Sequence, residues 1–241
     1  MKMKRETCAR RTSSIIGVGL LLVGCGASFD KIGDGAPERL TTITTSSGPC
    51  LQVWFDTTTP EEAHLAESAL EAVCGVLDAP GFDQALANTV AWTDGRGGVR
   101  PVCPADVLAE VKTLHAKPVH LIAAPVAGAN ATSLLYVNEQ TKKPTTGAPG
   151  PRDRAAINID AERLHFWVSP KPKDRACLID TLAHELTHLL PVALGSFEQK
   201  YQDRVKSGRD RMASYSFGHA AGCFFLQRPS DCPEMLDCPK T

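Results

Sequence analysis

One predicted helix most constrains the fold of this 241-residue chain, and it lies between Asp174 and Leu190. Its letters LIDTLAHELTHLL place leucines three or four residues apart, which is the spacing of one apolar helix face. Asp174 is predicted as the N-cap. Pro191 cannot extend a helix without strain, so we expect the helix to end near Leu190. The rest of the chain is organised around this helix.

The same helix carries the pattern H-E-x-x-H, as His184-Glu185-Leu186-Thr187-His188. His184 and His188 are four residues apart and share one helix face, so both imidazoles can bind one tetrahedral Zn²⁺. Glu185 lies about 100° round the helix from His184, beside the metal and not on it. There its carboxylate can take a proton from a zinc-bound water. The sequence therefore predicts a zinc site with Glu185 as the general base.

These residues resemble the signature of the zincin metallopeptidases. The resemblance implies an endopeptidase that acts on a protein or peptide substrate. The metzincin extension H-E-x-x-H-x-x-G-x-x-H is not present, because Pro191 and Leu194 stand at its Gly and last His positions. In zincins the substrate lies extended along an edge strand beside the active-site helix. We expect Leu164–Val168, which precedes this helix, to be that strand.

A catalytic zinc site needs a third protein ligand. The stretch GSFEQKY at residues 195–201 resembles the G-T-x-D-x-x-Y-G motif of the aspzincins, the deuterolysin-like metalloendopeptidases. In that family the Asp binds zinc and the Tyr stabilises the oxyanion, which implies Glu198 as the third ligand and Tyr201 as the oxyanion donor. The stretch departs from the motif, because Glu198 replaces Asp, Ser196 replaces Thr and Gln202 replaces the final Gly.

Other residues of the C-terminal part compete for these roles. His219 can complete a site of three histidines, and Asp210 is a further candidate ligand. Tyr215 lies one turn from His219 and is the alternative oxyanion donor.

The N-terminus is predicted to be an export signal. A basic segment, MKMKRETCARR, precedes an apolar segment from Ile15 to Val23. The letters LVGC at residues 22–25 resemble the bacterial lipobox, which implies that Cys25 becomes the lipidated first residue of the mature protein. Gly26 follows it where an Asp would indicate inner-membrane retention, which favours the outer membrane. We therefore expect an exported protein, lipid-anchored to the bacterial cell envelope.

The cysteine count fits an exported protein. Beyond Cys8 in the signal and Cys25, seven cysteines remain, which suits disulfide formation in an oxidising compartment. The net charge of −1 gives no electrostatic basis for binding nucleic acid. We expect the protein to associate with the membrane through the lipid on Cys25. The sequence does not indicate an oligomeric state.

Strands followed by clustered helices predict an α+β fold. We expect a zincin-like single domain, in which a small mixed sheet packs on the H-E-x-x-H helix with further helices after it. Thr59 is the predicted N-cap of a helix that starts at Pro60. Further helices are predicted at residues 105–114, 195–205 and 209–226, and strands at residues 50–56, 86–92, 118–126, 133–138, 155–159 and 164–168.

The domain organisation that follows has three parts: a lipoprotein signal peptide at residues 1–24, a lipidated flexible tether at 25–49 and a zincin-like metallopeptidase domain at 50–241. The Gly-, Ser- and Thr-rich composition favours the tether, with a first strand through residues 40–43 as the alternative.

Three functional hypotheses fit the sequence. The first is a lipid-anchored zinc endopeptidase, and the second is a lipoprotein that binds zinc without catalysis. The third is an envelope or adhesion lipoprotein in which the pattern is incidental. Glu185 favours the enzyme, since a structural zinc site needs no free carboxylate beside the metal.

Overall fold

A computed structural model describes the chain at residues 39–56, 59–87, 92–95, 101–126, 129–138, 140–141, 145, 150, 152–192, 198–203 and 212–227. The predicted signal peptide and Cys25 lie outside these residues. Residues 39–45 form a strand that pairs with the strand beginning at Gly48, so this part of the predicted tether is folded and the alternative strand is present.

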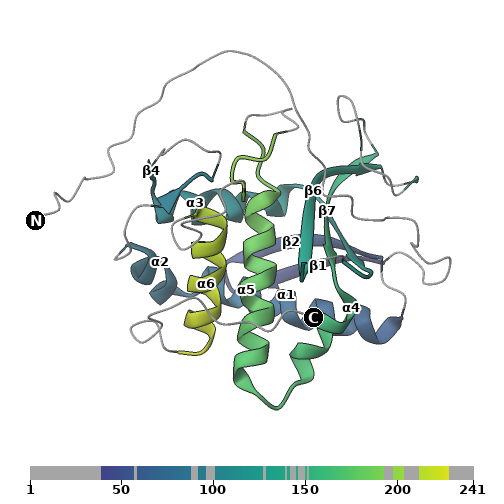
Figure 1. The fold of residues 1–241 in the computed structure, drawn as a ribbon, viewed down its shortest axis with the longest axis horizontal. Coiled ribbons are helices and arrows are strands. Elements are labelled where there is room, and N and C mark those ends of the chain that lie inside the picture. Colours follow the sequence, from purple (N-terminus) through teal and green to yellow (C-terminus); the bar gives the residue numbers. More distant parts are fainter. Residues whose placement is uncertain are drawn as a thin grey trace, which may run out of the picture.

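The main sheet is mixed and five-stranded (Figure 1). In spatial order its strands are β1 (Arg39–Thr45), β2 (Gly48–Asp56), β5 (Val119–Ala123), β7 (Asp153–Ile159) and β6 (Ala131–Asn138). The three central strands run parallel, whereas β1 and β6 pair antiparallel to their neighbours at the two edges. A second, two-stranded sheet joins β3 (Trp92–Thr93) to β4 (Pro101–Val102). The predicted α+β class is therefore confirmed.

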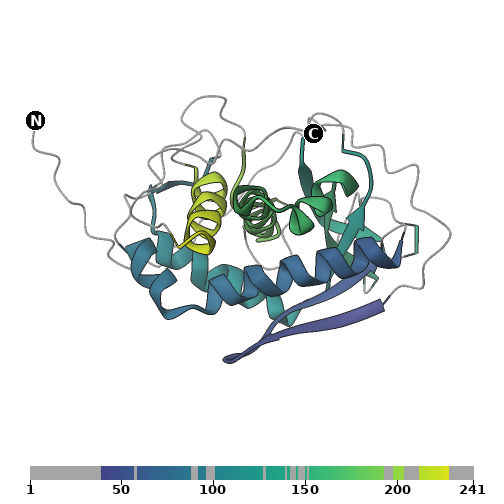
Figure 2. The same ribbon diagram turned by 90° about the horizontal axis from the view of Figure 1, so that it is seen from below.

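Two helices that are separate in the sequence lie side by side at the centre of the molecule. They are α5 (Pro172–His188) and α6 (Ala213–Phe225), and Figure 2 shows α1 running crosswise beneath both. The other helices are α1 (Pro60–Asp78), α2 (Pro80–Ala87), α3 (Pro104–Val111) and α4 (Ala161–Leu164), with 3-10 turns η1 (Lys112–Ala116) and η2 (His165–Val168). None of the described helices is long and apolar enough to cross a membrane.

Local sequence signals explain several of these elements. Thr59 caps α1 as predicted: its hydroxyl accepts from the Glu62 N–H at 3.1 Å, and the Glu62 carboxylate accepts from the Thr59 N–H at 3.0 Å. Side chains of β6 alternate between buried and half-buried, as expected for a strand that covers a core with one face. A disulfide from Cys50 to Cys74 ties β2 to α1.

The predicted strand at Leu164–Val168 is wrong, because this segment forms the end of α4 and the turn η2. Asp160 is the N-cap of α4, because its side chain accepts a hydrogen bond from the Glu162 N–H at 3.0 Å. Arg163 and Leu164 are then both fully buried at 0% exposure. The segment is therefore helical, with Leu164 buried and Val168 64% exposed, and is not an alternating strand.

Three further boundaries differ from the predictions. Leu86 lies in α2, so the start of the predicted strand at 86–92 is wrong, whereas Trp92 begins the short strand β3. Asp174 is the third residue of α5, and Lys171 is the N-cap. Residues 198–203 of the predicted 195–205 helix are irregular backbone, joined to the end of α5 by a bridge between Pro191 and Gln199.

Candidate metal centre

The end of α5 presents both histidines on one face. Their ring centroids are 4.7 Å apart, and the Nε2 atoms of His184 and His188 lie 3.0 Å from each other. His184 is 9% exposed and His188 is 7% exposed, so little water competes for these nitrogens. The helical spacing alone brings these two nitrogens together.

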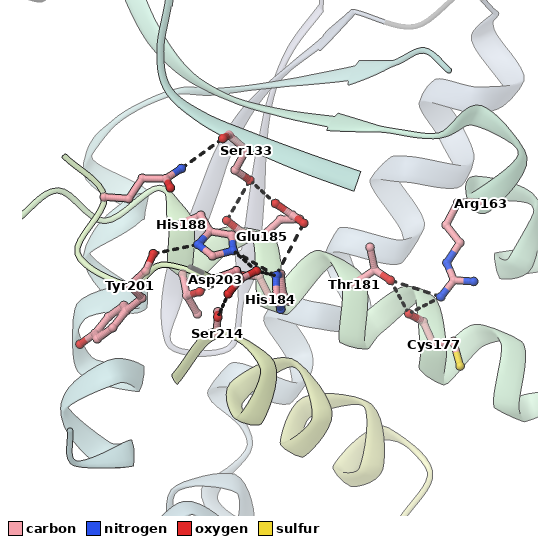
Figure 3. Close-up of polar contacts among 12 residues, drawn as sticks. Ser133, Arg163, Cys177, Thr181, His184, Glu185, His188, Tyr201, Asp203 and Ser214 are labelled. Atoms are coloured by element: carbon pink, nitrogen blue, oxygen red, sulfur yellow. Dashed lines mark hydrogen bonds and ion pairs between the residues drawn. The ribbon is translucent and has the colours of Figure 1, made fainter. Parts of the chain in front are cut away.

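A third group reaches the same point from residues 198–203. The Oδ2 atom of Asp203 lies 3.0 Å from His184 Nε2 and 3.1 Å from His188 Nε2 (Figure 3). The Asp203 side chain keeps 28% of its surface exposed. Two imidazole nitrogens and one carboxylate oxygen therefore converge at the end of α5.

Two of the three ligand groups, His188 and Asp203, are each oriented by a second contact. His188 Nδ1 lies 2.9 Å from the backbone carbonyl of Tyr201, so it donates there and Nε2 is the nitrogen directed at the cluster. Ser214, in the first turn of α6, donates to Asp203 Oδ1 at 2.5 Å. This bond leaves Oδ2 for the histidines, so α6 helps to orient the carboxylate.

Glu185 lies beside the cluster and is held by the edge strand. Its Oε1 atom is 3.9 Å from His184 Nε2, beyond the distance of a shared hydrogen bond. The Ser133 hydroxyl on β6 lies 2.7 Å from Glu185 Oε2 and 3.1 Å from the Glu185 carbonyl (Figure 3). The carboxylate is 5% exposed. This arrangement keeps it next to the ligand atoms without joining them.

The segment 198–203 that carries Asp203 is fastened on several sides. Glu110 on α3 forms an ion pair with Lys200 and accepts from the Tyr201 hydroxyl at 3.1 Å. Backbone bonds run from the Lys200 N–H to the Leu190 carbonyl at 2.7 Å and from the Gln202 N–H to the Asp94 carbonyl at 3.0 Å. Together these bonds fix the path that delivers Asp203 to the histidines.

The charges of the cluster stabilise one another. Burial lowers the pKa of His188, but the hydrogen bond to Asp203, its charge and that of Glu185 raise the pKa to about 9. Burial raises the pKa of Asp203, yet hydrogen bonds from His184 and His188 hold it well below its usual range. Without metal, the carboxylate is therefore ionised and His188 carries a proton at neutral pH.

The geometry fits a metal ion. Ligand atoms about 2.0–2.1 Å from one tetrahedral zinc are roughly 3.3 Å from one another. The three separations here are 3.0, 3.0 and 3.1 Å, so the three atoms surround one common point. Among the residues that the structure describes, these are the residues that can hold a metal ion. A centre with three protein ligands leaves a coordination position for another group.

Three of the predicted site residues lie together, but the predicted third ligand does not join them. His184, Glu185 and His188 lie together as expected, whereas the third group is Asp203 and not Glu198. The Glu198 carboxylate accepts from the Gln202 side chain at 3.4 Å and is not part of the cluster.

The alternative candidates also lie away from the ligand atoms or outside the described residues. His219 approaches the Cys223 sulfur at 3.5 Å, and Asp210 lies outside the described residues.

Tyr201 and Tyr215 are the two tyrosines considered as oxyanion donors, and only the alternative, Tyr215, has its ring at the site. The Tyr201 hydroxyl bonds to Glu110, and the side chain points away from the cluster (Figure 3). Its contribution to the site is its backbone carbonyl, which orients His188. Tyr215 on α6 packs its ring against His184, with centroids 4.5 Å apart. Tyr215, the alternative donor, is therefore the tyrosine whose ring lies at the site.

Comparisons with known proteins give no relative to set beside this geometry. No family model matches the chain, and neither the curated proteins nor the solved structures contain a match.

Proposed function

We propose that this protein is a zinc-dependent endopeptidase with His184, His188 and Asp203 as the metal ligands. The observation that carries the proposal is the position of Glu185, a buried carboxylate 3.9 Å from His184 Nε2 that takes no part in the ligand cluster. A purely structural site does not require this group. Two imidazoles and one carboxylate are a ligand set that catalytic zinc uses in hydrolases.

A bound zinc ion supplies Lewis acidity, which polarises a carbonyl and makes a water acidic enough to react at neutral pH. The residues of this chain provide the rest. Glu185 accepts the proton from the attacking water and passes it to the leaving amine. Ser133 keeps the Glu185 carboxylate in place, with its hydroxyl 2.7 Å from Oε2. Tyr215, packed on His184, replaces Tyr201 as the proposed oxyanion donor.

The strand beside the proposed catalytic helix is β6. It forms one edge of the main sheet (Figure 1), and it contacts α5 through Ser133 and Glu185 (Figure 3). It therefore has the role expected of Leu164–Val168 from the sequence, that of an edge along which an extended peptide binds. With an edge strand beside the helix, the arrangement supports a zincin-like fold.

We also propose that the protein is exported and lipid-anchored through Cys25, as its basic and apolar N-terminal segments and the LVGC letters indicate. The disulfide between Cys50 and Cys74 supports an oxidising compartment, and Cys103, Cys177 and Cys223 are disulfide-bonded as well. The substrate is then a protein or peptide outside the cytoplasm.

The test is a comparison of wild type with Glu185→Gln in protein that begins at residue 26. Both should bind zinc equally, because Glu185 is not a ligand. Cleavage of fluorescein-labelled casein should fall by about 10²–10⁴-fold in the variant, the usual contribution of a general base. A wild type that binds zinc but cleaves no faster than the variant would refute the peptidase and favour a non-catalytic zinc lipoprotein.

A further inference from the structure

The edge strand β6 carries a hydrogen bond that belongs to neither the sheet nor the metal cluster. The Gln199 side-chain amide donates to the backbone carbonyl of Ser133 at 3.1 Å. In an antiparallel pair, alternate residues direct both main-chain groups away from the neighbouring strand. Since the Ser133 carbonyl is bonded by Gln199, it faces the outer side of β6, away from β7.

This carbonyl is placed where a peptide would meet the proposed catalytic groups. The hydroxyl of the same residue holds the Glu185 carboxylate. An amide N–H presented by a side chain is chemically equivalent to the peptide N–H of an added strand, which is how extended peptides bind a sheet edge. The Gln199 amide therefore occupies a position in which a substrate's main chain would extend the sheet.

We propose that Gln199 occupies the main-chain binding position of an extended peptide substrate on β6 and is displaced when the substrate binds. The inference rests on the proposed function, because it assumes that the occupant is a peptide. Gln199 is then a residue that sets substrate affinity: each substrate must break the bond from Gln199 before it bonds to Ser133.

The side chain of Gln199 can leave without releasing its segment. The backbone of the segment is held by the Val192 N–H, which donates to the Glu198 carbonyl at 2.9 Å, and by the Lys200 N–H, which donates to the Leu190 carbonyl at 2.7 Å. The side-chain amide of Gln202 also donates to the backbone carbonyl of Gln199 at 3.0 Å. None of these bonds uses the Gln199 side chain, so Asp203 should keep its place when that side chain is removed.

The experiment measures kcat and KM for fluorescein-labelled casein with wild type, Gln199→Ala and Gln199→Glu, after equal zinc contents have been verified. Both variants remove the donor, and Gln199→Glu keeps the size of the side chain. KM should fall by about two- to tenfold, the worth of one hydrogen bond, while kcat stays unchanged. Gln140→Ala, an exposed glutamine beyond the end of β6, serves as the control with unaltered KM.

An unchanged or increased KM in Gln199→Ala would overturn the inference. A separate binding measurement distinguishes this failure from failure of the proposed function. Zinc-loaded Glu185→Gln and the double variant Glu185→Gln/Gln199→Ala are titrated into the same labelled casein, and fluorescence anisotropy gives Kd. Tighter binding by the double variant supports the inference even where no cleavage is found. Equal or weaker binding contradicts it.

Discussion

At the residue scale, the metal cluster combines two side chains that the sequence predicts with one that it does not. His184 and His188 follow from helical spacing, which is a local property of the chain. Asp203 lies fifteen residues after His188 in irregular backbone, where no periodicity indicates a direction. Its position depends on bonds to Asp94 and Glu110, which are more than ninety residues earlier. The resemblance to the aspzincin motif implied Glu198, because Glu198 stands at the position of the zinc-binding Asp in that motif.

The raised pKa of His188 predicts a pH-dependent affinity for zinc. Below about pH 9 this imidazole holds a proton in the metal-free protein, and zinc must displace it. The apparent association constant should therefore rise with pH, by up to about tenfold per unit between pH 6.5 and 9. Titration of chelator-treated protein with zinc at several pH values measures this. An affinity independent of pH would contradict the proton displacement.

The same shifts predict how stability changes in the metal-free protein. A raised histidine pKa contributes stability that is fully present below the unfolded value of about 6.5 and is lost as pH rises through about 9. The depressed pKa of Asp203 acts in the opposite direction, since its contribution is lost as pH falls below about 4. The Tm of chelated protein should thus decrease from pH 6.5 to 9, and that of zinc-loaded protein should change less.

Ser214 is predicted to tune the metal through Asp203. Its hydroxyl donates to Asp203 Oδ1 at 2.5 Å and directs Oδ2 towards the histidines. Ser214→Ala should weaken zinc binding by about 10–100-fold, as loss of such orienting contacts usually does. Ser214→Thr keeps the hydroxyl and should retain most of the affinity. Equal zinc affinity in wild type and Ser214→Ala would show that the bond does not orient the ligand.

At the element scale, the site depends on how closely α5 and α6 approach. A Cβ added at Gly218 would lie 2.5 Å from the Asp180 carbonyl and 2.9 Å from the His184 Cβ. This contact of α6 with α5 brings Ser214 to Asp203 and Tyr215 to His184. The helices themselves are predicted by apolar spacing, but their separation is set by one missing side chain. Sequence periodicity carries no information about such a distance.

Gly218→Ala is therefore expected to disturb the metal site as well as the fold. In an open helix position the change from Gly to Ala stabilises by about 1 kcal/mol. Here the overlap with α5 should instead reduce the free energy of unfolding by about 1–3 kcal/mol, with a loss of zinc affinity. Gly75→Ala on α1 is the matched control, because nothing lies within 4 Å of its added Cβ. Thermal unfolding and zinc titration of both variants distinguish the two outcomes.

Sequence patterns are also limited as a guide to which apolar segments form strands. The strands at β2, β5, β6 and β7 were predicted from alternating or β-branched letters, and each is present. The segment Leu164–Val168 has equally apolar letters, but the cap at Asp160 directs it into α4 and η2. The strand that borders the site could therefore not be chosen from proximity in sequence.

At the scale of the whole molecule, the site is assembled from three separate regions of the chain. The edge strand supplies Ser133, α5 supplies both histidines and Glu185, and residues 198–203 with α6 supply and orient Asp203. Ser133 and Glu185 are 52 residues apart in sequence. The class of the fold and the half of the site on α5 could be predicted, because both depend on local patterns. The meeting of the three regions depends on sheet order, which local patterns do not give.

The proposed anchor is also a property of the whole molecule and can be tested separately. Cys25→Ser should prevent lipid attachment, so the protein should move from the detergent-rich phase to the aqueous phase when it is produced in a bacterium. Cys8→Ser is the matched control, since Cys8 lies in the basic segment of the predicted signal. Partition of Cys25→Ser into the detergent phase to the same extent as wild type would contradict lipidation at Cys25.

The most direct test of the account is the zinc content of Asp203→Ala, measured by mass spectrometry after dialysis against trace zinc. Wild type, Glu198→Ala and His219→Ala should each retain one zinc ion per chain. Asp203→Ala should retain almost none, because it loses the carboxylate that lies 3.0 and 3.1 Å from the two histidine nitrogens. A wild type without zinc, or an Asp203→Ala variant that keeps it while Glu198→Ala loses it, would contradict the account.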